Sequence, residues 1–129
     1  KKILLYWASK RNLRRDIAYS TKVKLPVMEI EANLPQGLFT VYSAYKFRYK
    51  TLPADYNEVW IYSDAKEIEH RFPLTNGIPT LYVLKPDEHL MGFKQIPIGQ
   101  LYVDLWNMDK WYAQPYLKEL EAKINGILE

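Results

Sequence analysis

Three charged residues in the middle of the chain have the types that metal-dependent nucleases use. Asp55 is followed by Asp64 and Lys66, an acidic residue and then an acid-x-lysine pair. If such carboxylates converge, they can hold a divalent cation that activates a water molecule for hydrolysis. The pattern has low specificity, because a chain with 15 acidic and 18 basic residues contains acid-x-lysine pairs by chance. Asp64 also suits the N-cap of a predicted helix, so the nuclease is kept as an alternative.

Other catalytic or metal-binding groupings find little support in the sequence. There is no cysteine, which excludes disulfides and thiol chemistry, and the two histidines, His70 and His89, are far apart and have no obvious partner. Glu29 and Glu31 could be paired carboxylates, but alternation along an exposed strand explains them more simply. We therefore predict a protein that is not an enzyme and that holds no cofactor or metal.

The basic residues are concentrated near the start of the chain. Asp16 is the one acidic residue up to Lys24, whereas the rest of the sequence is net acidic and the total charge is only +3. The apolar spacing over residues 2–19 predicts a helix with its cations on one side. Such a side is either a solvated surface or a phosphate-contacting patch without sequence specificity. The candidate nucleic-acid residues are Lys10, Arg11, Arg14, Arg15, Lys22 and Lys24.

Hydrophobic patterns predict the elements that must position these residues. Residues 59–62 form a continuous apolar run typical of a central strand, and the spacing of Asp64 and Glu67 after it predicts a capped helix. Residues 40–50 fit a helix begun by Thr40, although alternation at the odd positions also fits a strand; we favour the helix. Further strands are predicted over 22–31, 80–84 and 90–98.

The C-terminal part of the chain is predicted to form a strand, a turn and a long helix. Alternating apolar residues indicate the strand over 100–106. The apolar stripe that follows predicts a helix, mainly from Pro115, because proline is tolerated in the first turn of a helix. Asn125-Gly126 is the predicted end of that helix.

Aromatic residues crowd the turn between this strand and this helix, and Asp104 lies among apolar neighbours. A charge in that position needs a partner, which is either a lysine, an arginine or a backbone amide of the chain, or another protein. Clustered aromatic residues are either a packed corner or a binding anchor. The candidate partner-interface residues are Tyr102, Asp104, Trp106, Trp111 and Tyr112.

These elements define an α/β (α+β) fold in a single domain spanning residues 1–129. We predict a mixed β-sheet of about four to six strands, with helices packed on it and a helix at the C-terminal end. No apolar run reaches the roughly 18 residues needed to span a bilayer, and no signal-peptide pattern is present, so we expect no membrane partner and a cytoplasmic location. Because the chain begins at Lys1 rather than methionine, we expect it to be a fragment of a longer protein.

Five hydrophobic blocks follow one another in a recognisable order. They are FTVYSAY at 39–45, EVWIYSD at 58–64, GIPTLYVLKPDEHL at 77–90, QLYVDLW at 100–106 and WYA at 111–113. In this order they resemble the C-terminal domain of the AbiEi family, antitoxin-type transcriptional regulators of type IV toxin–antitoxin systems. The resemblance covers most of the chain from about Thr40 onward, and none of the blocks is a catalytic signature.

The resemblance implies a two-part protein. A winged-helix part, expected upstream and not in this chain, would bind operator DNA, so that DNA is contacted through the full-length protein. The α/β domain would oppose a nucleotidyltransferase-like toxin and assist DNA binding or self-association as a homodimer. The expected function is therefore that of a non-catalytic regulatory domain. The alternatives are a metal-dependent nuclease of the restriction-endonuclease type and a structural protein-interaction module that dimerises through its tyrosine-rich surface.

Overall fold

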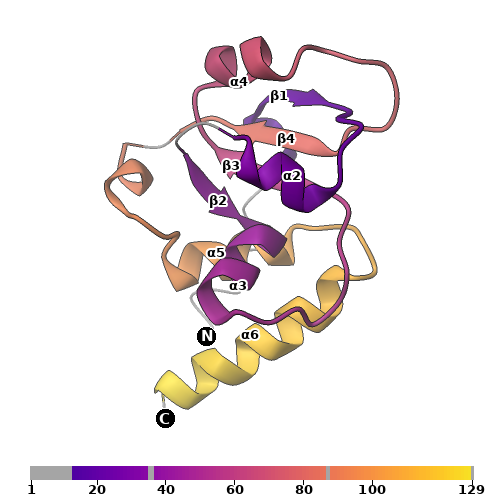
Figure 1. Cartoon of the computed structure of the whole chain (residues 1–129). Coiled ribbons are helices and arrows are strands. Elements are labelled where there is room, and N and C mark those ends of the chain that lie inside the picture. Colours follow the sequence, from indigo (N-terminus) through magenta and orange to yellow (C-terminus); the bar gives the residue numbers. More distant parts are fainter. Residues whose placement is uncertain (1–12, 35–36, 87, 129) are drawn as a thin grey trace.

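The computed structural model describes residues 13–34, 37–86 and 88–128, and it contains one mixed β-sheet (Figure 1). The strands lie in the order β1-β4-β3-β2, with β3 parallel to β4 and the two outer strands antiparallel to their neighbours. The predicted α/β class is therefore confirmed. The strands are β1 (Ile17–Thr21), β2 (Leu38–Thr40), β3 (Val59–Tyr62) and β4 (Leu81–Leu84).

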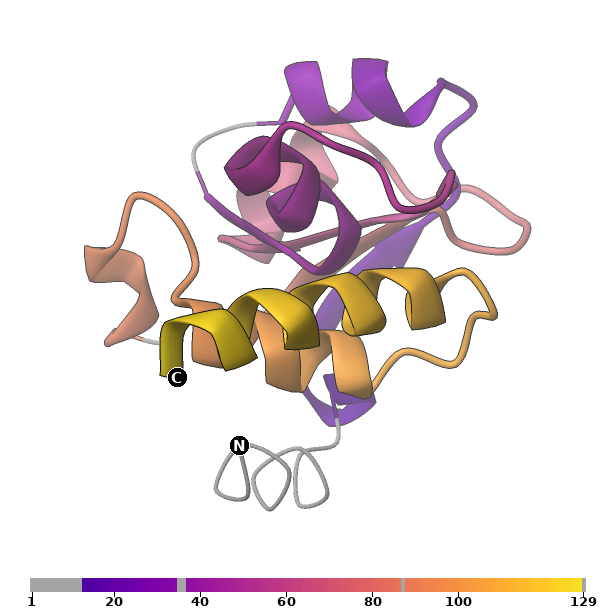
Figure 2. The same cartoon turned by 90° about the horizontal axis from the view of Figure 1, so that it is seen from below.

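Helices cover both faces of this sheet, because β3 is apolar on both sides. Its side chains alternate, so that Val59 and Ile61 belong to one hydrophobic cluster while Trp60 and Tyr62 belong to the other. The first cluster includes residues of α2 (Val27–Ala32) and α4 (Ala65–Arg71), and the second includes residues of α3 (Val41–Tyr49), α5 (Ile98–Trp106) and α6 (Ala113–Leu128). Figure 2 shows the three helices of the second cluster lying together, with α6 packed against α5 and α3.

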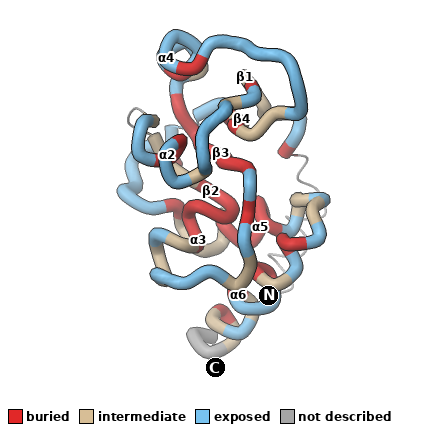
Figure 3. The backbone as a smooth tube through the Cα atoms, turned by 45° about the vertical axis from the view of Figure 1, so that its right-hand side comes forward, coloured by how far each residue is buried: buried red, intermediate tan, exposed pale blue. Residues whose placement is uncertain are grey.

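The centre of the fold agrees with the sequence prediction. All four residues of β3 are buried, as expected of a central strand (Figure 3). The Asp64 side chain accepts a hydrogen bond from the Lys66 backbone N–H at 3.0 Å and caps α4, so the strand–helix–strand unit β3-α4-β4 is confirmed. The helix predicted over 40–50 is also confirmed as α3, with Thr40 as its N-cap residue.

Two predictions near the start of the chain are wrong. The helix predicted over 2–19 is not continuous, because residues 13–16 form a short 3-10 helix and β1 follows directly. The remainder of that prediction lies outside the described residues. The strand predicted over 22–31 is largely replaced by α2, which begins after Pro26. The Pro26 carbonyl accepts from the backbone N–H groups of Glu29 and Ile30, which starts a helical turn instead of an extended edge.

Two further predictions fail in the C-terminal part. The segment 100–106 is not a strand but most of α5, in which five consecutive residues from Leu101 to Leu105 are buried. Burial on every side leaves no clear period, so alternation in the sequence misidentified the element. The strand predicted over 90–98 is also wrong, because this segment contains the 3-10 helix Leu90–Gly92 and a loop.

The C-terminal helix is confirmed as α6, the longest helix of the fold in the described ranges. It begins at Ala113, shortly before Pro115, which lies in its first turn where the missing backbone N–H costs nothing. It does not end at Asn125-Gly126 but continues to Leu128, so the predicted stop is wrong. No helix in the described part of the chain is both long enough and apolar enough to cross a lipid bilayer.

Candidate functional site

Two tryptophans are exposed where α5 gives way to α6. Trp106 is the last residue of α5 and is 43% exposed, and Trp111 lies in the following turn and is 78% exposed. Both were predicted as interface residues. Exposed tryptophans are uncommon, because the side chain is large and mostly apolar, and those near the centre of protein interfaces often carry much of the binding energy. We call the segment 102–112 the aromatic corner.

Each exposed tryptophan rests on a buried tyrosine of the same corner. Trp106 stacks on Tyr102 with ring centroids 6.4 Å apart and an interplanar angle of 28°, and Trp111 meets Tyr112 edge-on at 5.6 Å and 90°. Tyr102 and Tyr112 were also predicted as interface residues, but both are buried within the chain. Their buried rings therefore support the two exposed tryptophans from the side of the protein interior.

Hydrogen bonds fix these two supporting rings. The Tyr102 hydroxyl donates to the Glu121 carboxylate on α6 at 3.0 Å, and the Tyr112 hydroxyl donates to the Asn57 side chain before β3 at 2.9 Å. Burial raises the pKa of Tyr102 to about 12, and burial also raises the pKa of Tyr112 above its ordinary value. Both phenols therefore stay neutral donors across the physiological range.

Asp104 ties α5 to the sheet. It is fully buried, and its Oδ2 accepts from the Thr40 hydroxyl at 2.6 Å and from the Tyr62 hydroxyl at 2.8 Å. Its Oδ1 accepts from the Gln100 side-chain amide at 2.8 Å. The sequence had suggested a lysine, an arginine or a backbone amide as the partner, whereas these contacts come from two hydroxyls and a side-chain amide. Such a network orients the helix that carries Trp106.

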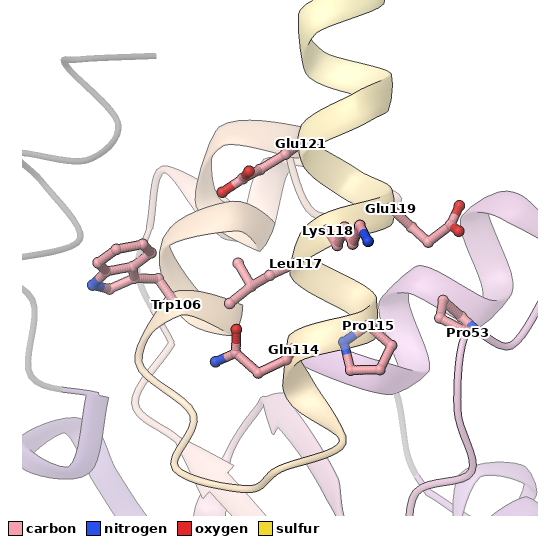
Figure 4. Close-up of a pocket in the computed structure, with 8 residues that line it drawn as sticks. All are labelled: Pro53, Trp106, Gln114, Pro115, Leu117, Lys118, Glu119 and Glu121. Carbon is pink, nitrogen blue, oxygen red and sulfur yellow. The ribbon is translucent and has the colours of Figure 1, made fainter.

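A groove of about 970 Å³ runs beside Trp106 along the first half of α6 (Figure 4). In this view Leu117 and Gln114 extend from α6 toward the side of Trp106, while Pro115 lies on the side of Pro53. The lining therefore mixes apolar side chains with charged ones, as protein-binding surfaces do. The lining residues are Pro53, Trp106, Gln114, Pro115, Leu117, Lys118, Glu119 and Glu121.

The predicted nucleic-acid residues fall into two groups. Arg14 and Arg15 lie in the 3-10 helix before β1, and Lys22 and Lys24 follow the strand, all four of them exposed. The Arg14 guanidinium is also paired with the Asp109 carboxylate at 2.6 Å. Because β1 separates the two groups, the structure does not gather them into one patch. Lys10 and Arg11 lie outside the described residues.

The three candidate nuclease residues do not converge, because Asp55 lies apart from Asp64 and Lys66. Asp64 caps α4 and follows β3, whereas Asp55 belongs to the loop that precedes β3. The strand between them is roughly 13 Å long at about 3.3 Å per residue, well beyond the reach of a shared metal ion. Among the residues that the structure describes, no group of three histidine, cysteine or acidic side chains could hold a metal.

Glu31 is a buried acid whose role the sequence did not indicate. Its Oε2 accepts from the Ser43 hydroxyl and the Tyr56 hydroxyl, each at 2.5 Å, and its Oε1 pairs with the Lys46 ammonium. The predicted strand had placed Glu29 and Glu31 on one exposed side. In α2 they point to different sides, so that Glu29 is exposed and Glu31 joins α2 to α3.

Glu58 is a second buried acid that the sequence did not indicate. It directly precedes β3 and is 4% exposed, and burial raises its pKa above the ordinary value for glutamate. The Asp109 carboxylate raises that pKa further, whereas Trp60, Lys110 and Arg14 act in the opposite direction. The apolar run 59–62 gives no sign that the acidic residue before it is buried.

Comparison of the chain with protein-family models, with curated proteins and with solved structures found no match. The aromatic corner offers two large apolar side chains, held from below, beside a groove of mixed character. This arrangement suits the binding of another protein.

Proposed function

We propose that this chain is a non-catalytic binding domain of an AbiEi-like regulator, and that the aromatic corner holds a protein partner. The observation that carries the proposal is the pairing of each exposed tryptophan with a buried, hydrogen-bonded tyrosine. Binding orders flexible side chains at a cost of about 0.5–1.5 kcal/mol each, so anchors that are already ordered bind more tightly.

The use made of the acids supports a binding function over a catalytic one. Asp104 and Glu31 are each hydrogen-bonded to neighbouring hydroxyls in the interior, where they join helices to the rest of the fold. Asp64 is occupied as a helix cap. These carboxylates serve to position elements, which is a structural role.

In this proposal the longer protein contacts operator DNA through an upstream part and acts in the cytoplasm. The α/β domain opposes a nucleotidyltransferase-like toxin, and the aromatic corner contributes the contacts that this activity needs. The proposal therefore requires a nucleotidyltransferase-like protein encoded beside this one. If no such neighbour exists, the antitoxin part of the proposal fails.

Growth of cells that express the nucleotidyltransferase-like neighbour tests the proposal. Co-expression of the full-length regulator should restore growth, and the Trp106→Ala/Trp111→Ala variant should restore it at least tenfold less well. The matched control is Leu74→Ala, which removes an exposed apolar side chain that is 72% exposed and follows α4 on the other face of the sheet. This control should rescue growth like the wild type.

Equal rescue by the double tryptophan variant and the wild type would contradict the proposed role of the aromatic corner. The variant must be present at the wild-type level, which immunoblotting of the same cultures checks. Because Trp106 is more than half covered and stacks on Tyr102, we expect the double replacement to lower the free energy of unfolding by about 1–3 kcal/mol, which leaves the domain folded if its stability is in the usual range. A loss of rescue can then be assigned to the surface.

A further inference from the structure

The outer strand β1 has features that the proposed function does not use. It forms one edge of the sheet and consists of five uncharged residues, IAYST, without proline. The opposite edge, β2, is only three residues long and leads straight into α3. Proteins usually protect a sheet edge with charges, prolines or a short strand, because a free edge can pair with another chain.

One side of the β1 backbone is available for pairing. β1 pairs with β4, and a strand bonded on one side directs the N–H and C=O groups of alternate residues away from its neighbour. In the described ranges no hydrogen bond reaches the backbone of Ile17, Ala18 or Ser20 from beyond this ladder. Ala18 lies at a shift in the register and is exposed.

Side-chain hydrogen bonds hold β1 in place on the side of α4. The Tyr19 hydroxyl donates to the Phe72 carbonyl at 2.8 Å, and the Thr21 hydroxyl donates to the Pro73 carbonyl at 3.1 Å. The backbone N–H of Val23, just after the strand, donates to the Thr80 hydroxyl at 2.9 Å. An edge that is already ordered loses little entropy when a further strand is added.

Cations stand at both ends of this edge. Arg14 and Arg15 precede the strand and Lys22 and Lys24 follow it, so the two groups are roughly 23 Å apart along an extended chain. In the ion pair between Arg14 and Asp109 both side chains are exposed, so the pair is weak and Arg14 can bind another carboxylate instead. From Arg14 to Lys24 four cations flank or follow the strand against one acid, Asp16, so the charge next to this edge is net positive.

We infer that β1 is a docking edge for an extended acidic segment of another protein, which adds to the sheet as a fifth strand. The backbone groups of β1 give affinity, and carboxylates at both ends of the segment meet the two cation groups. A second copy of this chain fits less well, because antiparallel pairing of two β1 strands would bring Arg14 and Arg15 against Lys22 and Lys24. DNA offers phosphates but no strand to pair with the neutral backbone between the cations.

Fluorescence anisotropy with a labelled peptide tests this inference. The probe is DDTVTVTVTEE, whose acidic ends flank a strand-forming centre. We expect measurable binding that weakens at least tenfold when alternate backbone amides of the peptide are N-methylated, and that disappears when all four acids are replaced by lysine. Amide hydrogen exchange at Ala18 and Ser20 should slow at least tenfold on addition of the acidic peptide.

A charge reversal on the protein completes the test. Arg15→Glu/Lys22→Glu should weaken binding of the acidic peptide at least tenfold, whereas Lys94→Glu/Lys123→Glu changes the net charge equally, away from β1, and should weaken it less than threefold. Equal affinity for the N-methylated peptide would overturn the inference. So would binding of a 20-base-pair DNA duplex without binding of the peptide, or a dimer by sedimentation that Arg15→Glu/Lys22→Glu abolishes. The tryptophan variants should leave peptide binding unchanged, so this test is independent of the proposed function.

Discussion

Truncation of Asp104 perturbs the network that positions α5. The Asp104→Ala variant removes the acceptor of three donors, which are the hydroxyls of Thr40 and Tyr62 and the side-chain amide of Gln100. Thr40 begins α3 and Tyr62 belongs to β3, so the change affects the joint between α5, α3 and the sheet. Asp104 is fully buried, and water therefore cannot easily replace the lost carboxylate.

The expected cost follows from the burial and the number of donors. A hydrogen bond to a charged group contributes about 1.5–3 kcal/mol, and contributions within one network do not simply add. Truncation leaves three buried neutral donors without this acceptor, and at about 1–3 kcal/mol for each unsatisfied group, with incomplete additivity, the total is about 3–5 kcal/mol. We expect a loss in this range, which is a large part of the roughly 5–15 kcal/mol that stabilises a domain.

Urea denaturation, monitored by tryptophan fluorescence and by far-ultraviolet circular dichroism, measures this loss. Tyr62→Phe removes one donor and should cost about 1–2 kcal/mol. In the double variant with Asp104→Ala, the effect of Tyr62→Phe should largely disappear, giving a coupling free energy of about 1 kcal/mol or more. A cost below about 1 kcal/mol for Asp104→Ala, or strictly additive effects, would refute the reasoning that this network holds α5.

Three further predictions concern stability and titration. Burial raises the pKa of Glu58, so the free energy of unfolding should decline as pH rises from the ordinary glutamate pKa through the raised one. In urea denaturation, the Glu58→Gln variant should lack this decline and should be more stable than the wild type at pH 7. An unchanged pH profile in the variant would contradict this prediction. Lys50 has a left-handed backbone with φ 59° at the C-cap of α3, so Lys50→Gly should raise the free energy of unfolding by about 1 kcal/mol, and a decrease in the melting temperature would speak against this. Burial raises the pKa of both Tyr45 and Tyr102 to about 12, so titration followed by phenolate absorbance should show these two phenols still neutral at pH 11 in the folded protein. The free energy of unfolding should fall above about pH 10, because the tyrosines of the unfolded chain ionise first. Full ionisation of all tyrosines by pH 11 in the folded protein would show that these side chains are not buried.

The parts of the fold that sequence patterns predicted are those with local signals. The run 59–62 is apolar and short, and Asp64 with Glu67 marks the start of the next helix, so β3 and α4 needed no knowledge of distant contacts. At residues 40–50 two periods competed, and the helix was the correct choice, but the Thr40 hydroxyl donates to Asp104 and does not cap the helix. The cap of α4 was therefore a true local signal, whereas that of α3 was not.

The parts that failed depend on long-range contacts. Leu101 and Leu105 fit a strand by alternation and a helix by their spacing of four, and only packing against α3 and α6 decides for α5. β1 forms because it pairs with β4, which is distant in the sequence, and no local pattern predicts that pairing.

The candidate site was predicted in part. The crowding of aromatic residues at 102–112 indicated the corner, but it could not separate the exposed Trp106 and Trp111 from the buried Tyr102 and Tyr112. That separation depends on which side of α5 and of the turn faces the sheet. The partner of Asp104 was equally out of reach, because Thr40 and Tyr62 come from elements distant in the sequence.

The proposed function requires the tryptophans of the aromatic corner to be rigid although they are exposed. Nuclear magnetic relaxation of the indole N–H groups of Trp106 and Trp111 tests this directly, since it reports the amplitude of fast motion of each ring. We predict order parameters near those of a rigid backbone, about 0.8, and a clear drop for Trp111 in the Tyr112→Leu variant. Order parameters below about 0.6 in the unaltered protein would contradict the claim, because such rings are not held in place for a partner.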